Sequence, residues 1–382
     1  PEILFFWVAR MIIAGYEYRG REPFYDVYLT GLVRDKQKRK MSKSLGNSPD
    51  PIGLMEKYGA AGVRVGMLLC SPAGNDLLYD YSLPEQGRNF ANKIWNPFRL
   101  VKTMATDDTL EQPEASKAAV TWMRGTVDRV LAEIDDSFVR YRISDALMQA
   151  YKLFWDDFSG WYLEIIKPAF GQPMDGTTHR QTLEIFGTMM KILHPFMPFI
   201  TEEVWQRLEE RPEGSSIMME QMPLPAPYEA GMLLRFDTAR EIVTAVRAVR
   251  KEKNIPAREP LVLCAAPGAT GSEFDPVIIR MCNLSEIRVA EGKVQGAVSF
   301  RIHTSEFFIP LGEGVDHEEE IRKMEEELKY TEGFLATVLK KLSNEKFVAN
   351  APEAVIKHER KKEADALARI ATLQESIAHL KK

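Results

Sequence analysis

Residues 40 to 44 read Lys40-Met41-Ser42-Lys43-Ser44 and are followed by Leu45-Gly46-Asn47. The apolar and β-branched run from Val27 to Val33 precedes them and is typical of a buried strand. Two lysines among small hydroxyl side chains, ended by a Gly-Asn turn, suit a mobile loop that closes over a polyphosphate. A lysine is a compact point charge that can follow phosphate oxygens as charge moves toward departing pyrophosphate. The motif therefore predicts a catalytic loop.

A basic surface loop is the alternative interpretation, and Lys36, Lys38 and Arg39 just upstream would also support it. A run of Lys and Arg by itself indicates little about function. The complete motif, with Leu-Gly-Asn behind it and an apolar run before it, is more restrictive and favours the catalytic interpretation.

The size and composition indicate an ordinary protein of several domains. The chain has 382 residues, more than one hydrophobic core usually organises, so about two to four domains are expected. A 45% hydrophobic and 27% charged composition is typical of soluble proteins. The net charge of −5 gives no global attraction for nucleic acid, so any RNA contact must come from local basic patches.

The cysteines and the apolar stretches exclude several other classes. Cys70, Cys264 and Cys282 form no C-x-x-C pair, which argues against a disulfide framework and a structural zinc site and fits a reducing cytoplasm. The longest apolar stretch, from Ile3 to Gly15, is interrupted by Arg10 and is too short to span a bilayer. We therefore expect a cytoplasmic protein with no membrane role and no metal site of its own.

The pattern along the chain predicts a mainly α fold. Residues 1–47 read as a helix, continuously apolar from Ile3 to Ala14 as if packed on a buried sheet, and then a strand. Short elements broken by Pro and Gly fill residues 48–90, and amphipathic segments over 91–253 predict a helical bundle. Strand-like runs at 261–264, 287–289 and 307–309 predict a small α/β module over 254–316.

Aromatic side chains recur at helical spacing between Tyr151 and Tyr162. Such a stripe is more often part of the core than a platform for stacked bases, so we expect it to be buried.

The last segment, residues 317–382, shows a heptad seam on both sides of a turn at Asn350-Ala351-Pro352. The seam consists of Ile321, Met324, Leu328, Thr331, Leu335, Val338 and Leu342, then Ala366, Ile370, Leu373, Ile377 and Leu380. A seam, a turn and a second seam predict an antiparallel coiled-coil hairpin. At about 1.5 Å per residue each arm would be roughly 40 Å long.

Charge along this hairpin is segregated. Residues 318–332 carry seven acids against three bases, whereas residues 340–362 carry seven bases against three acids. Lys and Glu are the usual exterior of any coiled coil, so a solvated surface is the alternative, but a net charge of +4 at the tip favours phosphate binding. The residues predicted to bind phosphate are Lys340, Lys341, Lys346, Lys357, Arg360, Lys361 and Lys362.

Several stretches together resemble the valyl-tRNA synthetases, a family of class I aminoacyl-tRNA synthetases whose second signature is KMSKS. The likeness lies in Ile3-Leu4-Phe5-Phe6-Trp7-Val8-Ala9-Arg10-Met11, Gly31-Leu32-Val33-Arg34-Asp35, Arg88-Asn89-Phe90-Ala91-Asn92-Lys93-Ile94-Trp95, His194-Pro195-Phe196-Met197-Pro198 and Asn344-Glu345-Lys346-Phe347. It covers nearly the whole chain and is least specific between about residues 261 and 315.

The resemblance implies a domain order and a reaction. Residues 1–47 would be the second half of a partial Rossmann-like catalytic domain, 48–90 the region against the inner corner of the tRNA, 91–253 the anticodon-binding bundle and 317–382 a tRNA-binding arm. The reaction would be the ATP-dependent attachment of valine to tRNA-Val, with Mg²⁺ arriving with ATP and no structural zinc. A monomer is expected.

The resemblance also assigns roles within the motif. Lys40 and Lys43 would supply charge on the pyrophosphate side of ATP, with Lys43 the more important of the two. Ser42 and Ser44 would shape the loop and donate hydrogen bonds.

Two further groups of site residues follow from the resemblance. Glu2, Leu32 and Val33 would contact ATP. Ile3 and Trp7, four residues apart on one helical face, would line the pocket for the valine side chain. Core packing is the plain alternative for both residues and is compatible with that role.

The chain departs from the family pattern at two positions and lacks two features. Glu2 stands in place of an aspartate that binds the ATP ribose, and Ala61 stands in place of an aspartate after Gly-Ala, which leaves helix capping or a tRNA contact there in doubt. The 382 residues contain neither the His-x-Gly-His signature nor the editing insertion. We therefore expect a C-terminal part of the enzyme that is inactive alone.

Two other functions stay open at this point. A sister synthetase for isoleucine or leucine would share KMSKS and the bundle, although the run from Phe5 to Met11 and the hairpin argue against it. A non-catalytic tRNA-binding protein would need only the RNA-binding segments.

Overall fold

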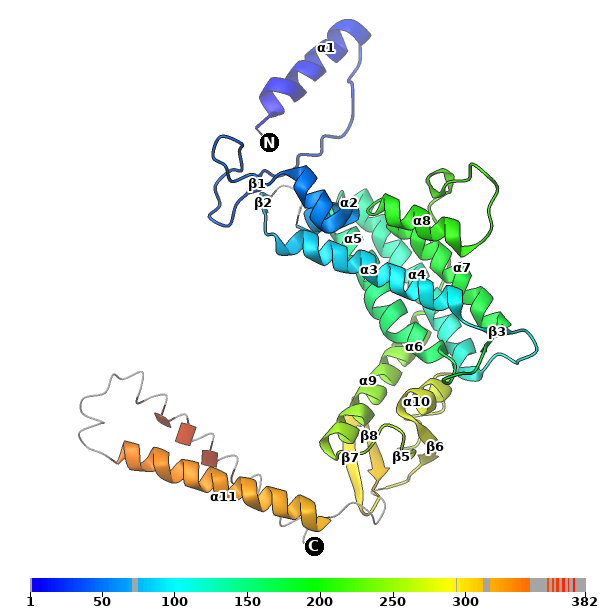
Figure 1. The fold of residues 1–382 in the computed structure, drawn as a ribbon, viewed down its shortest axis with the longest axis vertical. Helices are drawn as coiled ribbons and strands as arrows, with labels where there is room; N and C mark the ends of the chain where they lie inside the picture. Colours follow the sequence, from blue (N-terminus) through cyan, green and yellow to red (C-terminus); the bar gives the residue numbers. More distant parts are fainter. Residues whose placement is uncertain are drawn as a thin grey trace. The chain divides into compact units, whose positions relative to one another are not determined.

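The computed structural model describes residues 2–70, 75–292, 294–311 and 317–343, together with Ile356, Glu359, Arg360, Lys362, Glu363, Ala366, Leu367, Ile370 and Gln374. The chain forms two compact units, one of Pro1–Lys293 with Ser299–Phe308 and one of Val294–Val298 with Ile309–Lys382. Helices dominate the described residues and the sheets are small, as the sequence predicts (Figure 1). Within these ranges no helix is long and apolar enough to cross a membrane.

The elements follow one another in this order: η1 (Leu4–Val8), α1 (Ala9–Arg19), β1 (Val33–Arg34), α2 (Pro51–Leu69), β2 (Leu77–Leu78), α3 (Ser82–Thr103), β3 (Thr106–Asp107), α4 (Glu114–Val139), α5 (Ile143–Lys152), η2 (Leu153–Tyr162), α6 (Leu163–Ile166), β4 (Met174–Asp175), α7 (Gly176–Leu193), α8 (Pro198–Leu208), η3 (Ile217–Met219), α9 (Ala230–Glu252), β5 (Leu261–Ala265), α10 (Asp275–Cys282), β6 (Leu284–Val289), β7 (Ala297–Ile302), β8 (Ser305–Pro310) and α11 (His317–Leu342). Of these, η1 and η2 are π-helices and η3 is a 3₁₀ helix.

The segment before the KMSKS motif is helical, as predicted, but its predicted packing is wrong. Neither η1 nor α1 contains a buried residue, and Phe5 is 82% exposed. The predicted strand from Val27 to Val33 is also wrong, because only β1 pairs, in parallel with β2. A strand needs a neighbour for its backbone hydrogen bonds, and the described residues supply one only at β1.

The helices α2 and α3 pack against each other through glycines. A Cβ atom on Gly62 would lie 2.9 Å from the Pro84 carbonyl oxygen, and one on Gly87 would lie 2.3 Å from the Gly62 carbonyl oxygen. The two backbones therefore approach more closely than any side chain would allow. Since β2 leads into α3, this contact fixes the strand that pairs with β1.

A kink divides α2. The Asp50 side chain caps its start by accepting hydrogen bonds from the backbone N–H groups of Ile52 and Gly53. Gly59 has φ 75° and ψ 153°, so the helix is interrupted and resumes after it. Ala61 lies in the first turn of the resumed helix and has no side-chain oxygen to offer the free N–H groups there.

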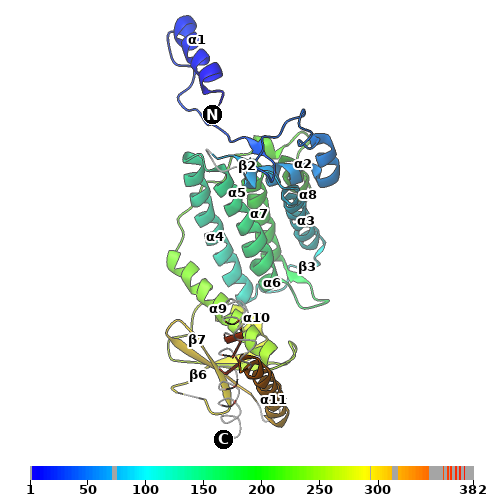
Figure 2. The ribbon, with the colours of Figure 1, turned by 90° about the vertical axis from the view of Figure 1, so that its left-hand side faces the viewer.

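The aromatic stripe of η2 is core, as predicted. The rings of Phe158 and Tyr162 stack with centroids 5.4 Å apart, and Phe186 of α7 meets Phe154 and Phe158 edge-on at 5.6 and 5.3 Å. All four side chains are fully buried. The Tyr162 hydroxyl exchanges a 2.8 Å hydrogen bond with Thr182, so the one polar group in this cluster is paired. The helices α4, α5 and α7 lie side by side around this core (Figure 2).

The small module has a four-stranded sheet in the order β6-β5-β8-β7. The strand β5 pairs in parallel with β6 and antiparallel with β8. The three predicted strand runs are confirmed as β5, β6 and β8, whereas β7 was not predicted from the sequence. The buried guanidinium of Arg250 in α9 donates to the carbonyl oxygens of Pro256, Glu259 and Cys282, which ties the bundle helix to the module.

In the second unit, α11 carries the first predicted seam. Leu328, Thr331, Leu335, Val338 and Leu342 are the less exposed positions from residue 328 onward, and Val338 is 2% exposed. The side chains of Ile321 and Met324 and the later seam residues Leu373, Ile377 and Leu380 lie outside the described residues.

The glycine contact between α2 and α3 predicts a steep steric cost at Gly87. Gly87→Ala should lower the free energy of unfolding by about 1–3 kcal/mol, because the new methyl group meets backbone that cannot rotate away. Chemical denaturation of the chain measures the change. Gly187→Ala is the matched control, since a Cβ there meets nothing within 4 Å and should stabilise α7 slightly. Equal midpoints for the two variants would contradict the close approach.

The uncapped turn after Gly59 predicts that Ala61→Asp stabilises the chain. A carboxylate in the first turn of a helix interacts favourably with the free N–H groups, which is worth about 0.3–1 kcal/mol at an accessible site. Thermal unfolding in low salt checks this, with Ala61→Lys as the control of opposite sign. A lower melting temperature for the aspartate variant would show that the kink does not expose such a helix start.

Candidate active-site loop and RNA-binding surfaces

The KMSKS motif begins where the chain folds back on β1. The Lys38 N–H donates to the Asp35 carbonyl oxygen at 2.8 Å, and the Asp35 N–H donates to the Arg39 carbonyl oxygen at 2.9 Å. Lys38 takes φ 62°, the left-handed conformation that a tight turn requires. Beyond the turn, the backbones of Lys40 and Arg34 form an isolated antiparallel β-bridge. The Met41 N–H donates to the Val33 carbonyl oxygen at 3.0 Å. The start of the motif is therefore fixed to β1.

The carboxylate of Asp35 lies at the centre of this turn. Oδ1 accepts from the backbone N–H groups of Gln37 and Arg39 at 3.0 and 2.9 Å. Oδ2 accepts from the Arg39 guanidinium at 2.7 Å and from the Asn47 amide at 3.1 Å. Burial alone would raise the pKa of Asp35, but the hydrogen bonds from Asn47 and Arg39 outweigh it and hold the pKa at about 2. Asp35 is therefore ionised at neutral pH.

The side chain of Asn47 closes the other end of the loop. Its oxygen accepts from the Ser42 N–H at 2.9 Å, and its nitrogen donates to Asp35 and to the Lys40 carbonyl oxygen, the latter at 3.3 Å. Asn47 thus joins Lys40 and Ser42 of the motif to Asp35 in the turn. The sequence analysis assigned no role to Asp35 or Asn47; Asx residues beside a turn were the available signal.

A second aspartate fixes the strand that carries the motif. Asp76 forms an ion pair with Arg34, and its Oδ1 accepts from the Leu32 N–H at 3.0 Å. The hydrogen bond from Arg34 lowers the pKa of Asp76. Gly31 is required at this point, because a Cβ there would lie 1.7 Å from the Asn75 carbonyl oxygen.

The two motif lysines have different surroundings. The Lys40 Nζ atom lies 3.2 Å from Oε2 of Glu2, so the predicted ribose ligand and the first lysine pair with each other across the surface. Such an exposed pair contributes little to stability and leaves both groups available to a ligand. Lys43 is exposed and has no ion-pair partner among the described residues. The hydroxyls of Ser42 and Ser44 lie 3.2 Å apart, and the Leu45 N–H donates to Ser42.

The remaining predicted ATP contacts line the base of the loop. Leu32 and Val33 are half-buried, and their backbone groups are already used: the Leu32 carbonyl accepts from Leu77 N–H and the Val33 carbonyl from Met41 N–H. They can therefore offer ATP apolar contact through their side chains. Over the same described ranges, no group of three His, Cys, Asp or Glu side chains could hold a metal ion.

Ile3 and Trp7 lie one helical turn apart, and the Trp7 N–H donates to the Ile3 carbonyl oxygen at 2.9 Å. Their side chains are 55% and 58% exposed. The described part of the chain therefore does not enclose a valine pocket around them.

The predicted basic tip of the C-terminal segment is only partly described. Lys346, Lys357 and Lys361 lie outside the described residues. Lys341 and Lys362 lie 3.9 and 2.8 Å from the Glu359 carboxylate, which is 6% exposed. Lys340, in the last turn of α11, and Arg360 are both exposed.

A groove between α3 and α8 combines an aromatic ring with cations. Its volume is about 640 Å³, and Trp95, Phe98, Arg99, Lys102 and Arg207 line it. The Trp95 ring is half-buried and lies 5.2 Å from the Phe98 ring, with the Arg207 guanidinium 5.9 Å away. Arg207 is ion-paired with Glu203, so Arg99 and Lys102 supply the positive charge beside the ring. A flat ring beside these cations suits an unpaired nucleotide, whose base stacks while its phosphates meet them.

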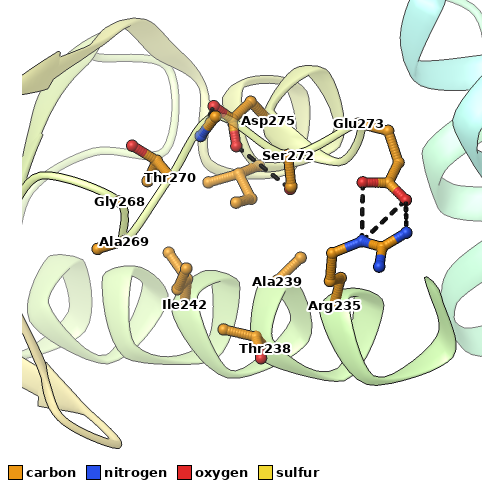
Figure 3. A pocket seen from close by; sticks show the side chains of 12 residues that line it. Arg235, Thr238, Ala239, Ile242, Gly268, Ala269, Thr270, Ser272, Glu273 and Asp275 are labelled. Atoms are coloured by element: carbon orange, nitrogen blue, oxygen red, sulfur yellow. Dashed lines mark hydrogen bonds and ion pairs between the residues drawn. The ribbon is translucent and has the colours of Figure 1, made fainter. Parts of the chain in front are cut away.

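Figure 3 shows another cavity, of about 500 Å³, between α9 and residues 268–275. Arg235 points toward Glu273, with which it forms bonds of 2.6 and 3.1 Å, and it also pairs with Glu229. The hydrogen bonds that Arg235 donates to Glu273 and Glu229 raise its pKa. Because two carboxylates neutralise this arginine, the cavity is a poor site for phosphate.

Three protein families match consecutive parts of the chain. The model described as tRNA synthetases class I (I, L, M and V) matches residues 1–80. The anticodon-binding domain of tRNA ligase matches residues 121–265, and the valyl tRNA synthetase tRNA binding arm matches residues 316–381.

Curated relatives match the chain from end to end. The valine–tRNA ligase of Parabacteroides distasonis is 56% identical over 382 residues, and that of Porphyromonas gingivalis is 57% identical over 380. The Listeria monocytogenes enzyme of the same name is 36% identical over 397 residues. All of this chain is covered, but only 43–44% of each relative, so the chain spans less than half their length.

Among solved structures, the LeuRS-tRNA-LeuAMS complex of Agrobacterium radiobacter K84 aligns with a TM-score of 0.42 and 18% identity, over 68% of this chain and 28% of that one. The family matches and the KMSKS loop define the class, a class I aminoacyl-tRNA synthetase. Within this class the chain belongs to the valine–tRNA ligase family, as the sequence predicts.

Proposed function

We propose that this chain supplies the KMSKS part of the active site and the tRNA-binding parts of a valine–tRNA ligase. The observation that carries the proposal is the loop itself, in which β1, Asp35 and Asn47 hold the backbone of the motif while Lys43 extends into solvent. The end-to-end identity to valine–tRNA ligases supports the choice of amino acid.

The proposed reaction has two steps. The carboxylate of valine attacks the α-phosphate of ATP, giving valyl-adenylate and pyrophosphate, and a terminal ribose hydroxyl of tRNA-Val then takes the valyl group. Phosphoryl transfer asks the protein mainly for positioning and charge neutralisation. Lys43 and Lys40 meet the charge that develops on the pyrophosphate oxygens, and Ser42 and Ser44 keep the loop in shape.

Other parts of the ATP and valine sites follow the same proposal. Lys40 exchanges Glu2 for a phosphate oxygen, which frees the Glu2 carboxylate for the ribose. Leu32 and Val33 give apolar contact to ATP, and Mg²⁺ arrives with the nucleotide. Ile3 and Trp7 form one wall of the valine pocket, and the longer enzyme of the family provides the remaining walls. Without these, the isolated chain forms no adenylate.

The division into segments is also a proposal. Residues 1–47 form part of the Rossmann-like catalytic domain, 48–90 the stem-contact region, 91–253 the anticodon-binding bundle, 254–316 the small α/β module and 317–382 the arm. The groove at Trp95 is a candidate contact for unpaired tRNA nucleotides. The proposed protein is a monomer in the cytoplasm.

The arm is proposed to be an antiparallel coiled-coil hairpin with a basic tip. The 3.9 Å distance from Lys341 near the end of α11 to Glu359 supports it, because residues 18 apart in sequence meet beside a helix end. The low exposure of Val338 and Ala366 supports a shared seam. A rigid arm of roughly 40 Å reaches the outer corner of a tRNA more easily than its anticodon.

In the full-length enzyme, Lys43→Ala should lower the rate of valyl-adenylate formation by about 10²-fold or more, with a smaller effect on valine affinity. The reason is that its charge is needed where the transition state develops. Valine-dependent ATP–pyrophosphate exchange measures both quantities.

Lys36→Ala is the control for this variant, because Lys36 is an exposed lysine of the same turn whose partner is Asp80, 2.9 Å away. It should retain the wild-type exchange rate. A Lys43→Ala enzyme that changed only the Michaelis constant for valine would show that Lys43 has a different role.

Replacing Lys357, Arg360, Lys361 and Lys362 with alanine should weaken tRNA binding by the full-length enzyme and flatten its salt dependence. Each lost phosphate contact should reduce the log–log salt slope by about 0.7 to 0.9. Adenylation without tRNA should stay unchanged. Binding titrations at several salt concentrations measure the slope.

The matched control neutralises Arg322, Lys323 and Lys329, which lie in the acidic half of the arm. That variant should keep the wild-type slope. If both variants bind tRNA with unaltered affinity and slope, the segregated charge serves only solvation.

A further inference from the structure

We propose that Asp35 and Asn47 are positioning residues for adenylation, which set the KMSKS lysines in place without touching ATP. This inference rests on the proposed function. It names two side chains to which neither the sequence analysis nor the family comparisons assign a role.

The bonding of Asp35 leaves it no capacity for a ligand. Each carboxylate oxygen already accepts two hydrogen bonds, with Oδ1 taking the N–H groups of Gln37 and Arg39 and Oδ2 taking the Arg39 guanidinium and the Asn47 amide. A carboxylate with four lone-pair directions is then fully used. A direct role in binding ATP or Mg²⁺ would require breaking this set of bonds.

Asn47 uses both of its amide N–H donors and one acceptor position inside the loop, and its bonds define the shape of the loop. Its oxygen accepts from Ser42, and its nitrogen donates to Asp35 and to the Lys40 carbonyl. These contacts close residues 40–47 into a ring across one side chain. Lys43 lies in the sequence between Ser42 and Asn47, and its side chain is exposed.

The ring changes how the loop can move. A closed unit joined to β1 through Met41 moves as a body, so the two lysines keep their spacing when the loop closes over the polyphosphate. Without the cross-link, the backbone of Ser42 and Lys43 must lose conformational freedom during the reaction itself. That cost falls on the transition state, because correct placement of the charge is required there.

The test uses valine-dependent ATP–pyrophosphate exchange by the full-length enzyme with Asn47→Ala and Asp35→Asn. In the second variant an amide N–H₂ group in place of Oδ2 faces the donors of Arg39 and Asn47, so the bond that joins Asn47 to the turn is lost while the size is kept. Both variants should lower kcat by about 10-fold or more and leave the KM for valine within about twofold.

Asp80→Asn is the matched control. Asp80 has a pKa of about 2, like Asp35, because a 2.9 Å hydrogen bond from the Ser82 N–H and an ion pair with Lys36 lower it. Its carboxylate accepts from the first N–H group of α3 and lies outside residues 40–47, so its replacement should leave kcat unchanged. Thermal unfolding of all variants shows that they fold.

A double-mutant cycle separates positioning from general stability. If Asn47 acts through Lys43, adding Asn47→Ala to Lys43→Ala should lower kcat far less than it does in the wild type, because the placed charge is already gone. A purely structural effect would lower kcat by the same factor in both backgrounds, together with the melting temperature, and would overturn the inference.

The remaining outcomes are also decisive. Wild-type kcat in both loop variants, with a large loss in Lys43→Ala, would overturn the positioning role and leave the proposed function standing. A wild-type enzyme without valine-dependent exchange would overturn the proposed function and this inference together.

Discussion

The carboxylate of Asp35 is the constraint on which the KMSKS segment depends. It accepts hydrogen bonds from the turn that precedes the motif and from Asn47, which follows it, so one buried charge organises both ends. Its position depends in turn on β1, which pairs with β2 and is held by Asp76. The glycines that let α2 and α3 touch fix β2, since α3 begins four residues after it. The geometry of the lysines is therefore set by contacts well outside the motif.

The sequence predicted the elements whose patterns are local. The burial of Phe154 and Phe158 could be predicted because aromatic rings repeat there at helical spacing. The strand β5 could be predicted because a short apolar run lies between turn signals. Prediction failed where burial depends on distant segments. The run from Ile3 to Ala14 is apolar enough for a core, yet its helices contain no buried residue. An apolar pattern indicates that a surface favours burial, but it does not identify the segment that covers that surface. The predicted strand from Val27 was wrong for the same reason, because its apolar pattern does not identify a neighbouring strand.

The candidate site divides along the same line. Lys40 and Lys43 could be selected from the motif, because charge at a fixed spacing is visible in a sequence. The roles of Asp35 and Asn47 come from hydrogen bonds across a turn, and short polar residues near turns are too common to be singled out in advance. In the arm, counting charges gives the net charge of the tip but not which lysines are paired, and Lys341 and Lys362 both lie beside the Glu359 carboxylate.

Hydrogen–deuterium exchange in the wild-type protein tests most directly the claim that the motif is held in place before any ligand binds. After correction for intrinsic rates, the N–H groups of Arg39 and Ser42, which donate to Asp35 and Asn47, should exchange at least about 10-fold more slowly than that of Lys43, for which the described residues offer no acceptor. Equal and rapid exchange at all three positions would mean that the carboxylate does not organise the loop, and would contradict the account.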